Sequence, residues 1–157
     1  MLDDFMYSNP MRIHFGKNIL ASLKDELSNY GKNILLTYGG GSIKKSGLYD
    51  EIVAILKDCG KNIIELPGVM ANSTIKKLYE GAKLAKEKQV DLILAVGGRS
   101  VCDYSKAISV SAFCEEDAWD KYFLRMEEPT CKIISCWIRL NYGRNMKRKE
   151  WLKCHQE

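Results

Sequence analysis

Two glycine-rich segments carry the residue types and the spacing that point most directly to chemistry. One reads Gly39-Gly40-Gly41-Ser42, and the other reads Gly97-Gly98-Arg99-Ser100, with Asp103 three residues further on. Glycines allow backbone N–H groups to approach an anion closely, and a helix that begins at such a turn adds a partial positive charge. Two such turns predict a site for an extended phosphate ligand such as a dinucleotide.

Each of these features also has a purely structural interpretation. A glycine cluster can be no more than a tight turn between strand and helix, and the helix dipole favours a carboxylate such as Asp103 near a helix start. The dinucleotide fingerprint G-x-G-x-x-G with a later acid is met only in part, because Gly39, Gly41 and Glu65 fit while position 44 is lysine. The pattern leaves both interpretations open.

The elements that must position these segments follow from hydrophobic periodicity. Apolar runs predict buried strands that begin at residues 33, 62 and 91, each 29 residues after the last, and a shorter strand is expected over 12–15. Between and after these strands, apolar residues at helical spacing predict helices over about 19–27, 48–57, 73–85 and 99–112. This alternation predicts an α/β fold with a parallel sheet. Both glycine segments would lie at the carboxyl edge of that sheet, where ligands bind.

The helix over 73–85 is predicted in more detail. Asn72 or Ser73 is its expected N-cap, because both side chains can accept a hydrogen bond from the first turn. Its spacing places five residues on the inward face: Ile75, Leu78, Tyr79, Ala82 and Ala85.

The composition is that of one globular domain. The 157 residues are 46% hydrophobic and 28% charged, which excludes a disordered chain. No apolar run reaches the length of about 18 residues that suggests a transmembrane helix. Asp3 and Asp4 stand where a signal peptide carries positive charge, so a cytoplasmic location is expected. Six cysteines lack C-x-x-C spacing and are expected to be ordinary thiols without disulfides.

The excess of basic residues is confined to one end of the chain. Residues 131–157 carry seven basic and two acidic side chains, whereas the preceding 130 residues carry 17 and 18. The main body therefore gives no electrostatic reason to expect nucleic acid. The basic segment, which also holds Trp137 and Trp151, leaves open an interaction with nucleic acid or an acidic partner beside the simpler interpretation of a solvated tail.

Longer stretches of the chain resemble a known family. Residues 36–47 and 94–103, which contain the glycine segments, resemble the iron-containing alcohol dehydrogenases and in particular their butanol dehydrogenase subgroup. Residues 9–16 and 117–120 resemble further segments of that family. The resemblance runs from about residue 3 to about residue 134. It implies, over 1–134, a parallel-sheet NAD(P)-binding domain of the iron-dependent alcohol dehydrogenase and dehydroquinate synthase type.

The resemblance also implies roles for the glycine segments. The pyrophosphate of NAD(P) would lie on Gly97, Gly98 and Ser100, Asp103 would be the family's cofactor-side aspartate, and Gly39 to Ser42 would face the adenosine ribose. Members that prefer NAD place an acid near that ribose, whereas this chain has Gly40, Ser42, Lys44 and Lys45, so NADP is expected over NAD. The family transfers a hydride between NAD(P)H and an alcohol or aldehyde, with iron or zinc as a Lewis acid.

Arg99 departs from the family pattern within the resemblance, because it replaces the third glycine of Gly-Gly-Gly-Ser. If that position needs a positive φ, a side chain costs about 1–2 kcal/mol. The bulk of the side chain would also hinder approach to the pyrophosphate, although its charge would partly compensate. We therefore expect weaker cofactor binding than in an Arg99→Gly variant. A second departure, Ser73 in place of a proline, is expected to be harmless.

The resemblance ends near residue 134, before the family's metal-binding segments. Residues 135–157 form a divergent basic tail, for which we predict an origin in a frameshift or a gene break. His14 and His155 are the only histidines, and neither occupies a ligand position of the family, so no metal ligand or catalytic residue is assigned. We therefore expect a truncated cofactor-binding half without the all-helical metal domain and with little activity alone. The alternative is a non-catalytic nucleotide-binding or dimerising module, and a homodimer is one expected partner state.

Overall fold

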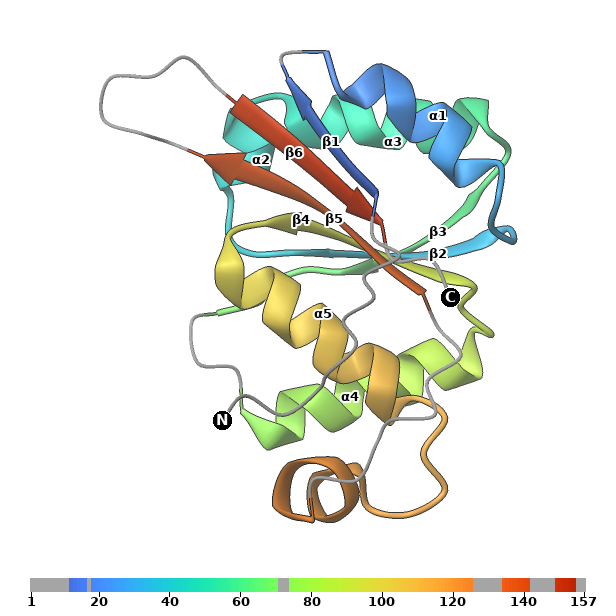
Figure 1. Ribbon diagram of the computed structural model, residues 1–157, viewed down its shortest axis with the longest axis vertical. Helices are drawn as coiled ribbons and strands as arrows, with labels where there is room; N and C mark the ends of the chain where they lie inside the picture. Colours follow the sequence, from blue (N-terminus) through green and yellow to red (C-terminus); the bar gives the residue numbers. More distant parts are fainter. Residues whose placement is uncertain (1–11, 17, 71–73, 126–133, 142–148, 155–157) are drawn as a thin grey trace, which may run out of the picture.

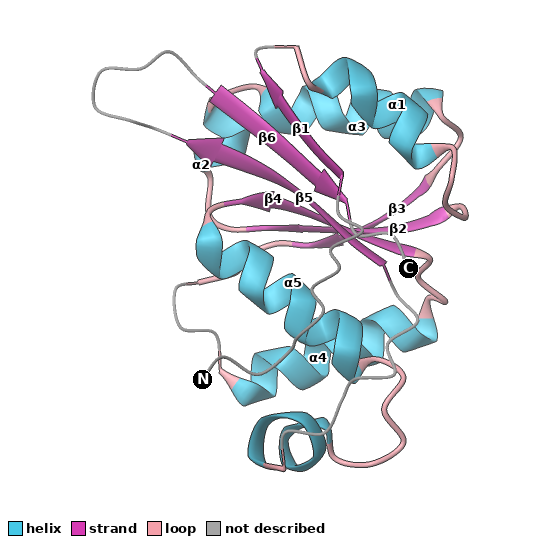
Figure 2. Cartoon of the chain, in the orientation of Figure 1, coloured by secondary structure: helices cyan, strands magenta, loops and turns pink. Residues whose placement is uncertain are grey.

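The computed structural model describes residues 12–16, 18–70, 74–125, 134–141 and 149–154. Its strands form one sheet (Figures 1 and 2): β1 (Arg12–Gly16), β2 (Asn33–Tyr38), β3 (Asn62–Leu66), β4 (Leu92–Gly97), β5 (Ile134–Asn141) and β6 (Lys149–Cys154). The helices are α1 (Leu20–Leu27), α2 (Ser42–Lys45), α3 (Leu48–Asp58), α4 (Ile75–Glu87), α5 (Arg99–Ser111) and the short π-helix η1 (Trp119–Leu124). The predicted strands and helices up to residue 112 are confirmed to within one or two residues.

The order of the strands creates a reversal in the middle of the sheet. The order is β1-β6-β5-β4-β2-β3, and the four strands β3, β2, β4 and β5 are parallel. From β2 the chain passes through α3 to β3 on one side, and from β3 it passes through α4 to β4 on the other side of β2. In such doubly wound sheets a crevice opens at the carboxyl ends of the two strands where the order reverses. Here these strands are β2 and β4.

Helices cover both faces of the sheet, as a parallel sheet requires. Figure 2 shows α1, α2 and α3 on one face and α4 and α5 on the other. Neighbouring residues of one strand alternate between the two layers: Leu36 packs with α1 and α3, whereas Leu35 packs with α4 and α5. The sheet core is completely buried along β4, which explains why the strand reads as an uninterrupted apolar run.

Two expectations for α4 are wrong. Its N-cap is Thr74, whose side chain accepts a hydrogen bond from the N–H of Lys77 at 3.4 Å. The expected candidates, Asn72 and Ser73, lie outside the described residues. Ile75 and Tyr79 were expected inside but are 40% and 37% exposed, because the helix turns a different set toward α5 and the sheet, with Leu78, Gly81, Ala82 and Ala85 buried.

The predicted parallel strands are extended at one edge of the sheet by antiparallel pairing. β6 is antiparallel to both β5 and β1, so the sheet is mixed at one edge. The backbone of β5 and β6 thus continues the sheet beyond residue 134, and the frameshift or gene-break origin of residues 135–157 stays a prediction.

Cys136, on β5 opposite Cys154, is disulfide-bonded, contrary to the expectation of thiols alone, whereas Cys59 and Cys114 are free. No helix in the described ranges is both long and apolar enough to cross a membrane.

Candidate functional site

The fold brings the two glycine segments together at the reversal of strand order. Tyr38 of β2 pairs with Val96 of β4 in the sheet, so Gly39 and Gly97 follow at neighbouring positions. A methyl group of Val101 lies 2.8 Å from the position of a Cβ atom on Gly97 and 3.8 Å from that of a Cβ atom on Gly39. The two turns therefore meet over one side chain of α5, at the edge where the sequence predicted a ligand.

Internal packing explains two of the glycines. Gly97 has φ +155°, a conformation that L side chains rarely adopt, and a Cβ atom there would overlap Val101. At Gly39 a Cβ atom would lie 3.3 Å from the carbonyl oxygen of Val69. The Val69 N–H donates to the carbonyl oxygen of Tyr38 at 3.1 Å, so the loop after β3 is tied against this turn. These two positions need no ligand to account for them.

Packing does not explain the remaining glycines of the two turns. A Cβ atom on Gly40, Gly41 or Gly98 would meet no atom of the described residues within 4 Å. Their backbone is also ordinary: φ is −72° at Gly41 and −84° at Gly98, and Gly40 is not among the glycines with positive φ. Side chains could be accommodated by the protein itself at all three positions. Bare backbone facing open space is what close approach of a ligand requires.

The second turn leads directly into α5. Gly98 is the N-cap, with extended backbone and no side-chain cap. Ser100 is half-buried, whereas Asp103 and Lys106 are exposed on the helix. The start of a thirteen-residue helix without a side-chain cap presents backbone N–H groups and the positive end of the helix dipole to the crevice.

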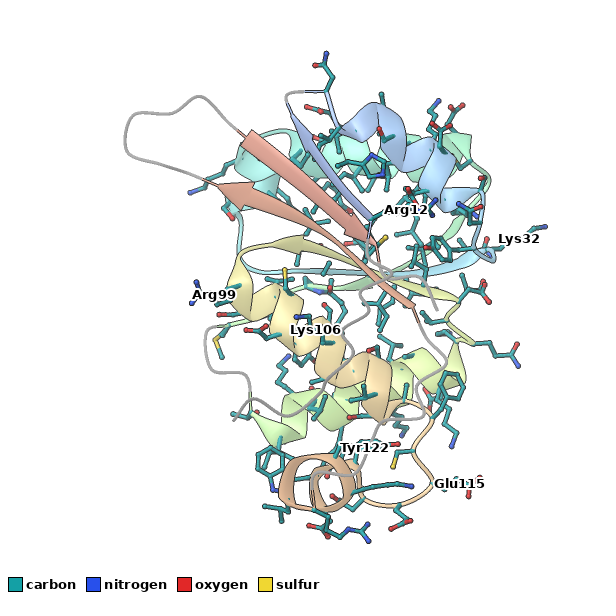
Figure 3. The ribbon with its side chains drawn as sticks, in the orientation of Figure 1. Arg12, Lys32, Arg99, Lys106, Glu115 and Tyr122 are labelled. Atoms are coloured by element: carbon teal, nitrogen blue, oxygen red, sulfur yellow. The ribbon has the colours of Figure 1, made fainter. Side chains whose placement is uncertain are left out.

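Arg99 does not carry the backbone strain that we considered from the sequence. It is the first residue of α5 and is not among the residues with positive φ. Its side chain is exposed and extends outward from the first turn of the helix (Figure 3). Any effect of Arg99 on a ligand must therefore come from its bulk and charge.

A buried hydrogen bond that the sequence did not reveal connects the end of β2 to α5. The hydroxyl groups of Thr37 on β2 and Ser105 on α5 lie 2.6 Å apart, and both side chains are fully enclosed. Ser105 donates its proton to the carbonyl oxygen of Val101 at 2.8 Å, which leaves Thr37 as the donor to Ser105. This chain of bonds fixes the beginning of α5 against β2. The only signal in the sequence was a threonine within an otherwise apolar strand.

A second polar cluster lies beside the first turn. The hydroxyl groups of Tyr38 and Tyr49 donate to the two carboxylate oxygens of Glu65, at 2.6 Å and 2.7 Å. These bonds, that of Tyr38 foremost, hold the pKa of Glu65 below its usual range. The pKa of Tyr38 is raised mainly by burial, and that of Tyr49 mainly by its bond to Glu65. The Nζ atom of Lys44 lies 4.7 Å from the ring centroid of Tyr49 and 5.5 Å from that of Tyr38.

A cluster of side chains that could hold a metal ion is relevant here, because the resemblance implies iron or zinc in the family. In the part of the chain that the structure describes, no three histidine, cysteine, aspartate or glutamate side chains gather as ligands. His14 instead lies 2.9 Å from Glu26 of α1, which also binds Arg12 at 2.7 Å. Asp117 of the resembling segment 117–120 accepts hydrogen bonds from Tyr79 and from the N–H groups of Trp119 and Asp120, and so orders the start of η1.

Comparison with known proteins identifies the family. The family model described as iron-containing alcohol dehydrogenase matches residues 10–136. The chain belongs to the iron-containing alcohol dehydrogenase family. It is 45% identical over 119 residues to the probable NADH-dependent butanol dehydrogenase 1 of Bacillus subtilis, covering 76% of this chain and 31% of that protein. It is 38% identical over 120 residues to the NADPH-dependent aldehyde reductase YqhD of Escherichia coli, covering 75% and 30%.

Solved structures of this family share the fold. The NADH-dependent butanol dehydrogenase A of Thermotoga maritima superimposes with a TM-score of 0.77 at 30% identity, covering 94% of this chain and 41% of that one. The Escherichia coli aldehyde reductase YqhD, in a form free of substrate and cofactor, gives 0.76 at 30% identity with the same coverage. The predicted family and α/β fold class are confirmed. The chain spans about a third of the length of the curated relatives it matches.

Proposed function

We propose that this chain binds a nicotinamide dinucleotide across the two glycine turns. The pyrophosphate would lie on the backbone of Gly97, Gly98 and Ser100 at the start of α5, and the adenosine ribose would face Gly39 to Ser42. One observation carries this proposal. Gly40, Gly41 and Gly98 expose bare backbone to open space at the point where the strand order reverses, and no contact among the described residues requires them to be glycine.

We further propose that NADP is preferred over NAD. Relatives are named for both cofactors, NADH for the Bacillus protein and NADPH for the Escherichia protein, so the names do not decide. Support comes from the first turn, where the residues nearest the proposed ribose are Gly40 and Ser42, with Lys44 and Lys45 in α2. A 2′-phosphate is favoured by nearby cations and by the absence of an acid within the turn.

For the whole protein we propose hydride transfer between NAD(P)H and an alcohol or aldehyde. The cofactor supplies the hydride when bound, and the residues of this chain bind and orient it. Backbone N–H groups at the start of α5 would hold the pyrophosphate, and Asp103 would lie on the cofactor side one turn into that helix. No step through a metal is derived, because the described residues do not fit one. The cytoplasmic location and the homodimer remain predictions.

A non-catalytic nucleotide-binding module is the second candidate, because the proposed site is built from the exposed backbone of two glycine turns, which suits binding by itself. An assay of the full 157-residue chain with NADPH and butanal, with and without added Fe²⁺ or Zn²⁺, distinguishes the two candidates. Aldehyde-dependent oxidation of NADPH supports an enzyme. Saturable binding of NADPH without turnover, which we expect, supports the module. Absence of NADPH binding by the folded chain contradicts both.

A further inference from the structure

Glu65 stands where a dinucleotide fold often carries a ribose-binding acid. It lies near the carboxyl end of β3 and pairs in register with Leu36 of β2, two residues before Tyr38 and the first glycine turn. A carboxylate at the end of the strand beside the nucleotide turn is suited to accept hydrogen bonds from ribose hydroxyl groups. Such a group, free to turn toward the ribose, would repel a phosphate on the 2′ position.

In this structure the carboxylate of Glu65 is already engaged. One oxygen accepts from Tyr38 at 2.6 Å and the other from Tyr49 at 2.7 Å, so the group is fixed from two elements, β2 and α3. The two rings meet edge to face, with centroids 5.6 Å apart. Lys44 lies over both rings, so its ammonium group contacts aromatic faces, and its charge also contributes to the lowered pKa of Glu65.

We propose that Tyr38 and Tyr49 determine nucleotide selectivity by restraining Glu65, which leaves Lys44 of α2 to favour a ligand with a 2′-phosphate. The inference rests on the proposed dinucleotide site. The tyrosines act as positioning residues: their hydroxyl groups hold the carboxylate of the exposed Glu65 in place and keep it from forming an ion pair with the lysine beside the turn. Removing either hydroxyl would release the carboxylate toward both the ribose and Lys44, and each change disfavours a phosphate there.

The test compares two ligands that differ only in the 2′-phosphate, 5′-AMP and adenosine 2′,5′-bisphosphate, titrated calorimetrically into the full chain. We expect the native chain to prefer the bisphosphate. Tyr49→Phe should lower that preference about tenfold, the effect of one like-charge contact near the surface, and leave 5′-AMP affinity within about twofold. Tyr79→Phe is the matched control, because Tyr79 also donates to a carboxylate, Asp117, but on α4, away from both turns.

A second substitution tests whether the effect runs through Glu65. Glu65→Gln removes the charge, so Tyr49→Phe should no longer change the preference in a Glu65→Gln background, and this comparison holds even if one single variant folds poorly. If both ligands bind and Tyr49→Phe leaves the preference between them unchanged, the inference is wrong but the proposed site stands. Neither ligand binding to the folded native chain overturns the proposed site and this inference with it.

Discussion

The two glycine turns are alike in sequence but are built differently, and the difference supports the different tasks that we propose for them. The turn after β4 begins with Gly97, fixed by its positive φ and by Val101, and leads into the thirteen residues of α5. The turn after β2 leads into the four residues of α2 and lies beside the Tyr38–Tyr49–Glu65 cluster. A long helix start suits a phosphate, whereas a turn surrounded by charged and phenolic groups suits selection between sugars.

The two turns are nevertheless one assembly. The side chain of Val101 lies next to both Gly39 and Gly97. The hydrogen bonds from Thr37 through Ser105 to Val101 tie β2 to the start of α5. Relative placement of the turns therefore depends on buried contacts beneath them. A ligand that spans both turns would be sensitive to these contacts even without touching them.

The largest expected effect separates glycines that packing requires from those it does not. Gly97→Ala places a Cβ atom 2.8 Å from Val101 in a strained backbone and should lower the free energy of unfolding by about 3 kcal/mol. Gly40→Ala points into open space and should change it by less than about 0.5 kcal/mol. Urea unfolding of both variants measures this. Equal losses would mean that the two turns are equally packed.

The connection between the turns should have the next largest effect. Thr37→Val keeps the shape of the side chain but removes the donor to Ser105, and we expect a loss of about 1–2 kcal/mol in unfolding free energy. Ser105→Ala should cost a similar amount, and the double variant less than the sum of the two, because both remove the same bond. Strictly additive losses in urea unfolding would show that the bond contributes nothing.

Arg99 tests the second turn by itself. Because the backbone there is unstrained, we expect Arg99→Gly to tighten NADPH binding by only about threefold through removal of bulk, equivalent to roughly 0.6 kcal/mol. Helix propensity should lower the unfolding free energy by up to about 1 kcal/mol in the same variant. Calorimetric titration separates the two effects. Equal or tighter binding by the native chain would mean that the guanidinium assists the ligand.

The smallest effect concerns pH and the first turn. The pKa of Glu65 is lowered by the hydroxyl groups of Tyr38 and Tyr49, so its contribution to stability is present above its unfolded pKa and is lost as the pH falls through the lowered folded value. Glu65→Gln should flatten this part of the acid dependence: the variant should be slightly less stable than the native chain at neutral pH, and the difference should vanish at low pH. Urea midpoints between about pH 6 and pH 3 would reveal it. Parallel curves for the two proteins would contradict the assignment.

The sequence predicted the strands and their carboxyl-edge glycines because buried parallel strands read as continuous apolar runs. The prediction that Ile75 and Tyr79 lie on the inward face of α4 is wrong, because spacing identifies a helical face but not how far the neighbouring elements extend to cover it. The antiparallel β6 and the contacts of Glu65 with Tyr38 and Tyr49 depend on residues far apart in the chain, and local periodicity carries no information on such pairs.

The central claim is that both turns contact one dinucleotide, and titration of NADPH into three forms of the full chain tests it most directly. These forms are the native protein, Gly40→Val and Gly98→Val, each checked by urea unfolding. We predict saturable binding by the native chain and a loss of at least about tenfold in each variant, with unfolding free energies within about 1 kcal/mol of the native value. Native binding that neither substitution weakens would contradict the account, because the ligand would then lie elsewhere.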